Sequence, residues 1–193
     1  PYGIDFFNNF YSEKCQDCLM DYINLKEKKK IIIFNARIPH YLEDSYFFNG
    51  KYTAKDKITK PYPKENLIKD LNILIDASDL FILIYPIPEH GWNTRDLIIN
   101  KTVDAIASNK NLSYEKKYWD LYSSPSIKIL NSLKSEKIKR IYPSEIFCAE
   151  FIVNECVAEF NEKYFYLDGF HLSSDGAEII VNEIEKLLIV QDK

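Results

Sequence analysis

The sequence has 193 residues, a formal net charge of -4 and a pI of about 5.5, with lysines and acidic residues interspersed along it. Its length is that of one globular domain, and its charge balance excludes the concentrated basic face of a nucleic-acid-binding protein. The longest apolar runs, at 31–34 and 80–87, are far shorter than the roughly 18 residues of a membrane-spanning helix. We therefore expect a single domain over residues 1–193, without a membrane crossing inside it and without a nucleic-acid partner.

Helical and strand patterns alternate in the first half of the chain. Residues 12–28 have apolar side chains at helical spacing, which predicts a helix. The continuous apolar run at 31–34 predicts a strand that is buried on both faces, as in a parallel sheet. The stretch 45–63 has no clear period and is expected to be a surface excursion. A helix is predicted at 64–77, and a second buried strand follows at 81–85.

The same alternation continues in the second half. Helices are predicted at 94–108 and 124–135, a third strand at 138–142 and a short fourth strand at 164–167. An amphipathic helix at 174–190 closes the chain. This order predicts an α/β fold, a three-layer sandwich with a mainly parallel sheet of the flavodoxin-like kind. In such sheets ligands bind at the loops that follow the carboxyl ends of the strands.

The chain has four cysteines, at positions 15, 18, 148 and 156. Cys15-x-x-Cys18 lacks the second C-x-x-C or the paired histidines of a zinc site, so we expect no metal. The spacing of Cys148 and Cys156 suits a local disulfide, which would indicate an oxidising compartment. Four reduced thiols are the alternative, and the sequence leaves the pairing open.

The run 166–177 holds a carboxylate and an imidazole three residues apart, Asp168 and His171, between a predicted strand and a predicted helix. Acyl transfer by a serine needs an imidazole that takes up the hydroxyl proton and a carboxylate that orients this imidazole. We predict that His171 is the base and Asp168 the orienting carboxylate. The alternative is a helix-capping aspartate beside a surface histidine.

The histidines at 40 and 90 also lie in predicted loops. Loop histidines are most often solvated, so we expect His40 and His90 to be exposed and without function. Trp92 could line a sugar-binding rim, because aromatic faces stack on sugar rings, and ordinary packing explains it equally well.

Residues 168–177, DGFHLSSDGA, resemble the last block of the SGNH hydrolase superfamily. More narrowly, they resemble the SGNH domains fused behind integral-membrane sugar O-acyltransferases of the O-antigen acetylase type. Two further segments are similar to parts of those domains: 31–41, IIIFNARIPHY, where Ile38 replaces the usual tryptophan, and 141–148 together with Cys156.

The resemblance has one gap. Family members carry their nucleophilic serine in a Gly-Asp-Ser motif after the first strand, and this sequence contains no Gly-Asp-Ser. We therefore expect the nucleophile and the first strand to lie upstream of Pro1, so that the chain holds part of an active site. A noncatalytic relic of the fold is the alternative.

The resemblance also implies an oxyanion hole, to which the turn after the strand at 31–34 would contribute. Either Asn35 or Arg37 could donate to the developing negative charge there. For Arg37, a structural ion pair with a carboxylate such as Asp168 or Asp44 is an equal alternative.

The function that the resemblance implies is O-acyl transfer, most simply of acetyl, to a sugar of a cell-surface polysaccharide or lipopolysaccharide. The partners would be an acylated donor, a carbohydrate acceptor and an integral-membrane acyltransferase domain on the amino-terminal side, and no metal or organic cofactor is needed. The domain would face the periplasm at the inner membrane. The alternatives are a free-standing periplasmic or secreted carbohydrate esterase and a noncatalytic carbohydrate-binding protein.

Overall fold

The computed structural model describes residues 21, 29–42, 45–48, 51–54, 63–91 and 112–189. Apart from Asp21, the helices predicted at 12–28 and 94–108 lie outside the described residues, as do Trp92, Cys15 and Cys18.

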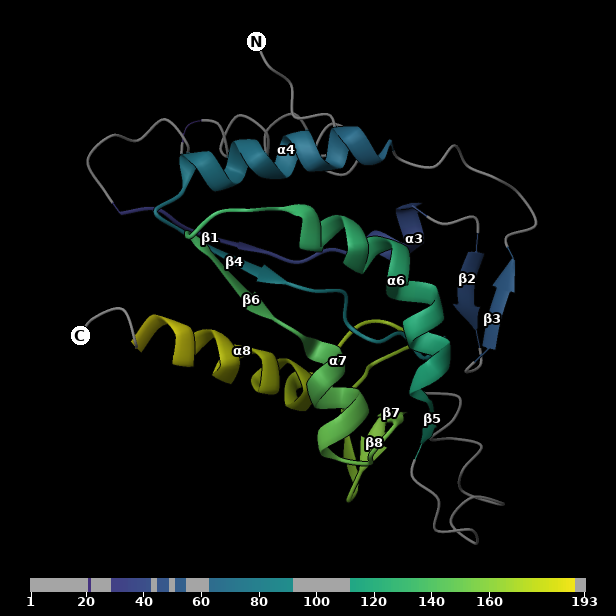
Figure 1. The fold of residues 1–193 in the computed structure, drawn as a ribbon. Helices are drawn as coiled ribbons and strands as arrows, with labels where there is room; N and C mark the ends of the chain where they lie inside the picture. Colours follow the sequence, from purple (N-terminus) through teal and green to yellow (C-terminus); the bar gives the residue numbers. More distant parts are fainter. Residues whose placement is uncertain are drawn as a thin grey trace, which may run out of the picture.

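The centre of the fold is a parallel sheet of three strands, in the order β1-β4-β6 (Figure 1). The strands are β1 (Ile31–Phe34), β4 (Leu80–Ile84) and β6 (Ile138–Ile141). The middle strand, β4, is buried along its whole length, as its unbroken apolar sequence predicts. All three predicted strands are confirmed, with ends that differ from the prediction by one residue at most.

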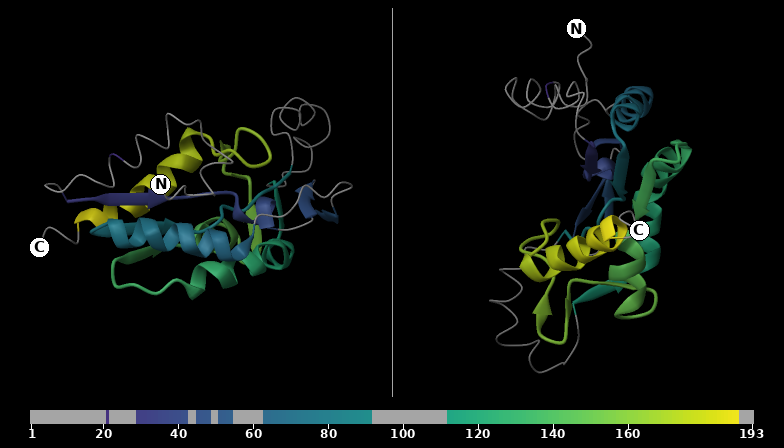
Figure 2. Two further views of the ribbon diagram at one scale, coloured as in Figure 1. Left: turned by 90° about the horizontal axis from the view of Figure 1, so that it is seen from above. Right: turned by 90° about the vertical axis from the view of Figure 1, so that its left-hand side faces the viewer.

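Helices cover both faces of this sheet (Figures 1 and 2). One core cluster joins Phe81 and Leu83 of β4 to α4 (Lys64–Ala77) and α6 (Lys116–Ser132). The alternate residues of β4 pack in a second cluster with α8 (Ser174–Ile189). Successive side chains of a strand point to opposite faces, so the sheet has a core on each side. The predicted α/β sandwich with a parallel sheet is confirmed.

The helices with a clear apolar period match their predictions. The bounds of α4 are those predicted, because Leu67, Leu71 and Leu74 recur at helical spacing and are all buried. The last helix, α8, ends one residue earlier than predicted.

Helix α6 begins eight residues before the predicted start at 124, and it continues through Pro125. A proline inside a helix removes one backbone hydrogen bond and usually ends the helix. Here the early turns are held by tertiary packing, because Trp119 and Tyr122 are fully buried in a cluster around two cysteines. That packing outweighs the local preference.

Two segments differ from the prediction. The excursion predicted at 45–63 contains a hairpin of β2 (Ser45–Phe48) and β3 (Lys51–Ala54), after the short helix α3 (Ile38–Leu42). The fourth strand predicted at 164–167 is wrong. Instead β9 (Lys163–Tyr164) pairs antiparallel with β8 (Glu159–Phe160), outside the parallel sheet.

The reason lies in the turn between β8 and β9. Asn161 and Glu162 both have positive φ angles, 51° and 65°, which fold the chain straight back in a tight hairpin. Beyond it, Tyr166 makes only an isolated antiparallel bridge to Leu172.

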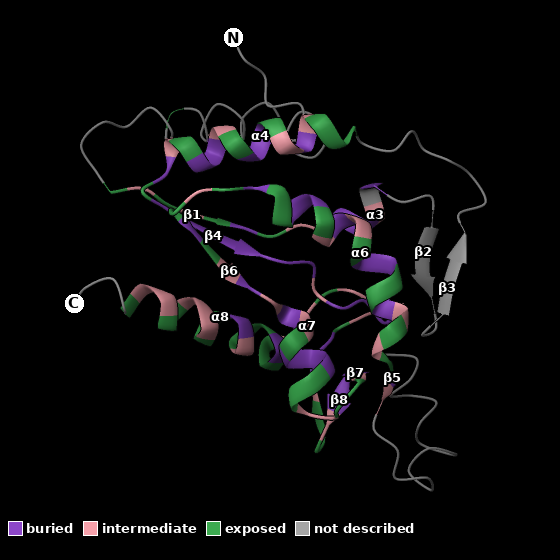
Figure 3. Ribbon diagram, in the orientation of Figure 1, coloured by how far each residue is buried: buried purple, intermediate pink, exposed green. Residues whose placement is uncertain are grey.

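The predicted disulfide between Cys148 and Cys156 is present. Cys148 lies in a single π-helical turn, η1 (Ile146–Glu150), which follows α7 (Pro143–Glu145). Cys156 lies in β7 (Glu155–Val157), which pairs antiparallel with β5 (Ser113–Glu115). We call the disulfide and its buried aromatic neighbours the disulfide cluster, which consists of Tyr114, Trp119, Tyr122, Cys148 and Cys156. Figure 3 shows how buried the elements are, with buried stretches of α6 in purple.

Candidate active site

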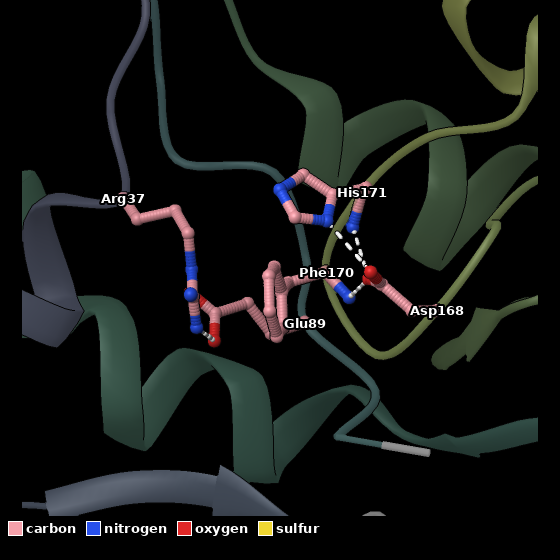
Figure 4. Close-up of polar contacts among 5 residues, drawn as sticks. All are labelled: Arg37, Glu89, Asp168, Phe170 and His171. Atoms are coloured by element: carbon pink, nitrogen blue, oxygen red, sulfur yellow. Dashed lines mark hydrogen bonds and ion pairs between the residues drawn. The ribbon is translucent and has the colours of Figure 1, made fainter. Parts of the chain in front are cut away.

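Three loops meet at the carboxyl end of the sheet: the turn after β1, the segment 85–91 after β4, and the turn 168–171 before α8 (Figure 4). Arg37 from the first loop contacts Glu89 of the second and Phe170 of the third. This is the edge of an α/β sheet at which ligand sites form.

Asp168 and His171 form the most polar part of this region. The His171 Nδ1 atom lies 2.6 Å from Asp168 Oδ2. The other carboxylate oxygen, Oδ1, accepts hydrogen bonds from the backbone amides of Phe170 at 2.9 Å and His171 at 2.8 Å (Figure 4). One carboxylate therefore holds both the ring and the backbone of its own turn.

The pair is open to solvent. The His171 side chain is 65% exposed and that of Asp168 39%. Partial burial acts to raise the pKa of Asp168, but hydrogen bonds from the His171 ring and from the two amides outweigh it, so this pKa is lowered from its ordinary value. Because Nδ1 faces Asp168, the Nε2 atom on the opposite side of the ring is the one placed to exchange a proton with a substrate or a nucleophile.

The segment after this turn starts the last helix. The Ser173 hydroxyl accepts a hydrogen bond from the Gly176 amide at 3.2 Å, which is the contact of a helix N-cap. A Cβ atom on Gly176 would lie 2.2 Å from the Phe165 carbonyl oxygen, so only glycine fits there. Ser173 is therefore a capping residue.

The turn 168–171 rests on the segment that follows β4. The Gly169 carbonyl accepts hydrogen bonds from the amides of His90 at 2.7 Å and Gly91 at 3.1 Å. A Cβ atom on Gly169 would approach the Gly91 backbone to 2.8 Å, so the absence of a side chain permits this contact.

Arg37 is bound to a carboxylate that the sequence did not single out. Its Nε and Nη2 atoms donate to the two carboxylate oxygens of Glu89 at 3.0 and 2.7 Å, a bidentate pair. The Glu89 side chain is 4% exposed and that of Arg37 32%. The guanidinium carbon also lies 3.7 Å from the centre of the Phe170 ring.

Asn35 lies at the end of β1 and is exposed. Its amide nitrogen is 3.4 Å from the Ile84 carbonyl and 3.5 Å from the Tyr85 carbonyl, distances at the long limit of hydrogen bonding. The predicted oxyanion donors thus lie in the same loop region as Asp168 and His171. Their role in binding an oxyanion stays a prediction.

The expectation that His90 is solvated is wrong. His90 is 1% exposed, and its ring packs edge-on against Tyr114 and Tyr166, at centroid distances of 5.1 and 4.4 Å. Burial lowers the pKa of His90 to about 3, against the smaller opposing effect of a hydrogen bond with the Val157 backbone. His40 is partly buried in α3.

A family model for the SGNH domain fused to AT3 domains matches residues 3–186. The chain belongs to this family. Neither the curated proteins nor the solved structures gave a match. The matched range contains the whole parallel sheet and the turn 168–171, so the structure described above is that of an SGNH domain associated with membrane acyltransferases.

The SGNH domain has site residues that sequence reasoning missed. Glu89 and Phe170 both contact Arg37, and they come from loops that the sequence did place at the edge of the sheet. The signal available for Glu89 was a carboxylate in the loop after the buried strand β4, since the loop after β1 contains Arg37 and both loops were expected at the same edge of the sheet.

Two features are absent from the described part of this SGNH domain. Its residues include no group of three or more His, Cys, Asp or Glu side chains placed to hold a metal ion. None of its described helices is long and apolar enough to cross a membrane.

Proposed function

We propose that this SGNH domain transfers an acyl group, most simply acetyl, between a donor and a carbohydrate hydroxyl, with His171 as the general base and Asp168 as its orienting carboxylate. The observation that carries the proposal is the contact of His171 Nδ1 with Asp168 Oδ2 at 2.6 Å beside a largely exposed imidazole. An imidazole oriented from one side and open on the other suits proton transfer.

The nucleophile in this proposal is a serine of the chain that precedes Pro1. The support is the Gly-Asp-Ser block of SGNH hydrolases, which has no counterpart in the sequence, and the match of the remaining blocks. Among the described residues, the hydrogen-bond partner of the His171 ring is Asp168, and Ser173 is engaged as the cap of α8.

The reaction has two halves. In the first, His171 Nε2 takes the serine proton as the serine oxygen attacks the acyl carbonyl, and the same proton then passes to the departing group. In the second, His171 takes the proton of a sugar hydroxyl, whose oxygen attacks the acyl-serine, and the serine oxygen leaves with that proton. Asp168 stabilises the imidazolium in both halves. The exposed amide of Asn35 is the proposed donor to the oxyanion.

Transfer is proposed over simple hydrolysis because the family is the one fused to AT3 domains. In this arrangement the membrane domain supplies the acyl group, and a cell-surface polysaccharide or lipopolysaccharide sugar accepts it. The disulfide between Cys148 and Cys156 supports placement in an oxidising compartment such as the periplasm.

The test uses the full-length gene product. Hydrolysis of p-nitrophenyl acetate and acetyl transfer to added oligosaccharides are measured for the unaltered protein, for His171→Gln and for Asp168→Asn. We expect kcat/KM to fall about 10³-fold or more for His171→Gln, since the base is lost.

Two variants serve as matched controls. His40→Gln removes another imidazole, and Asp175→Asn removes an exposed carboxylate of the first turn of α8. Asp175→Asn is expected to keep kcat/KM within about twofold, as surface substitutions usually do. His40 is partly buried in α3, so His40→Gln is compared per folded molecule, where its loss of kcat/KM should stay far below that of His171→Gln. Equal activity in His171→Gln and His40→Gln would refute the catalytic assignment, and hydrolysis without any transfer would favour the esterase alternative.

A further inference from the structure

The turn that carries Asp168 and His171 is held by contacts from other segments as well as by its own carboxylate. These contacts come from two loops far away in the sequence, those after β1 and β4 (Figure 4). Asp168 fixes the geometry within the turn, whereas the outer contacts fix where the turn lies relative to the sheet.

The first outer contact runs through Arg37. The planar guanidinium is fixed by two hydrogen bonds to Glu89, at 3.0 and 2.7 Å, and its face lies over the Phe170 ring at 3.7 Å. Phe170 is the residue between Gly169 and His171, and its ring centroid lies 4.5 Å from that of His171. The Phe170 ring therefore contacts both the guanidinium of Arg37 and the imidazole of His171.

The second contact is made by the backbone beside Glu89. The next two amides, of His90 and Gly91, both donate to the Gly169 carbonyl. The buried ring of His90 packs on Tyr166, two residues before Asp168, and fixes these amides. Glu89 therefore belongs to a segment that holds the turn both through Arg37 and through the backbone.

We propose that Arg37 and Glu89 are positioning residues that hold the Asp168–His171 turn in place at the edge of the sheet. This inference deepens the proposed function and rests on it for its catalytic meaning. It gives Arg37 a role besides oxyanion binding, because two of its five N–H donors, on Nε and Nη2, are used by Glu89. Glu89 has only acceptor oxygens, so it separates the two roles: it can position the turn but cannot donate to an oxyanion.

The first experiment follows the turn itself, without any reaction. Amide hydrogen exchange is measured at Phe170 and His171, whose N–H groups donate to Asp168, in Arg37→Met and in Glu89→Gln. If the contacts of Arg37 and Glu89 hold the turn, these two amides exchange about tenfold faster in both variants. Amides of β4 report on global opening and are expected to keep their rates.

Lys186→Met is the matched control, because its ammonium group pairs with Glu183 towards the end of α8, away from the turn. It should leave exchange at Phe170 and His171 unchanged. Since Arg37→Met leaves the buried Glu89 carboxylate without its counter-ion and could unfold the protein, Arg37→Lys serves as a milder variant that keeps the charge but loses the bidentate fork.

The second experiment measures kcat and KM in the protein with its natural flanking sequence. Misplacement of the base lowers kcat about 10-fold to 100-fold and leaves KM within about twofold, in Arg37→Met and in Glu89→Gln alike. Arg37→Lys should recover part of kcat.

The outcomes separate the hypotheses. Loss of kcat in Arg37→Met, with full activity in Glu89→Gln and unchanged exchange, would make Arg37 a direct donor and overturn the positioning role. Unchanged exchange in both variants would overturn it as well. The variants could exchange faster at these amides while the full-length protein neither transfers nor hydrolyses acyl esters. That result would support the positioning role of Arg37 and Glu89 and reject the proposed function.

Discussion

Two regions of this domain are fixed by opposite means. The Asp168–His171 turn is exposed and held by hydrogen bonds, whereas the disulfide cluster is buried and held by a covalent bond and aromatic packing. Polar contacts at a surface contribute little to stability but orient side chains well, while buried aromatic rings contribute much of the free energy of folding. The first region is suited to proton transfer, and the second to keeping the fold intact.

His90 lies between the two regions. Its ring contacts Tyr114 of the disulfide cluster and Tyr166 beside the turn, and its amide holds Gly169. The comparison therefore predicts that substitutions in the cluster change stability, that substitutions in the turn change activity, and that His90 couples the two.

The largest effect on stability is expected from Trp119→Ala. Trp119 is fully buried in the disulfide cluster, so its removal should lower the free energy of unfolding by about 3 to 5 kcal/mol, measured by urea denaturation. Activity per folded molecule should be unchanged. Leu121→Ala, at a 63% exposed position of the same helix, is the control and should cost less than about 0.5 kcal/mol.

The next effect is a response to acid. The pKa of His90 is about 3 in the fold, against a usual value of 6.5, so between these values the unfolded chain takes up a proton that the folded chain does not. Stability should therefore fall as the pH drops below 6.5, by about 1.4 kcal/mol per pH unit from this residue.

Denaturation at pH 7 and pH 4.5 measures this response. The loss between the two should be smaller by about 3 kcal/mol in His90→Gln, which cannot take up the proton. Leu121→Ala, at an exposed position that does not titrate, is the control and should keep the loss of the unaltered protein. Equal losses in all three proteins would contradict a buried neutral His90.

Removing the disulfide is expected to have a similar or smaller effect. The double variant Cys148→Ala, Cys156→Ala opens a short loop, with a sequence separation of 8. The chain-entropy estimate for such a loop is about 2 to 3 kcal/mol in the free energy of unfolding. The double variant Cys15→Ala, Cys18→Ala is the matched control. A larger loss in its free energy of unfolding would contradict the expectation that the Cys148–Cys156 disulfide is the more important pair for stability.

The smallest effect on stability is expected in the turn. In Gly169→Ala the new methyl group meets the Gly91 backbone, so the turn must move. We expect kcat to fall about tenfold while the free energy of unfolding falls by about 1 kcal/mol. Ser174→Ala, at an exposed position of α8, should change neither quantity. A large loss of stability with full activity in Gly169→Ala would contradict the expectation that the turn affects activity more than stability.

The sequence predicted the parts of the fold in which one pattern dominates. The strands β1 and β4 have uninterrupted apolar runs, and the helix α4 has a clear helical period. β6 has the sequence IKRI and was located by its place directly ahead of Tyr142 and Pro143. The start of α6 was missed because Pro125 is a strong local signal, while the packing of Trp119 and Tyr122 that overrides it is a tertiary effect.

The candidate site was predictable to the extent that it is local. Asp168 and His171 lie in one turn, so their spacing predicted their contact, although their catalytic roles stay a prediction. The partner of Arg37 was missed because Glu89 is 52 residues away and only the fold brings it close. His90 was misjudged since its burial depends on Tyr114 and Tyr166, which lie in other segments.

The local origin of the Asp168–His171 pair has a consequence for how such a site can vary. The pair is built within four consecutive residues and tied to its own backbone, so it moves as one unit. A displacement of the turn preserves the alignment of the carboxylate and the imidazole and changes only the distance between the imidazole and the group that it would contact. Under the proposed function, this distance is set by Arg37 and Glu89, and it is the one that would be adjusted to sugar acceptors of different size.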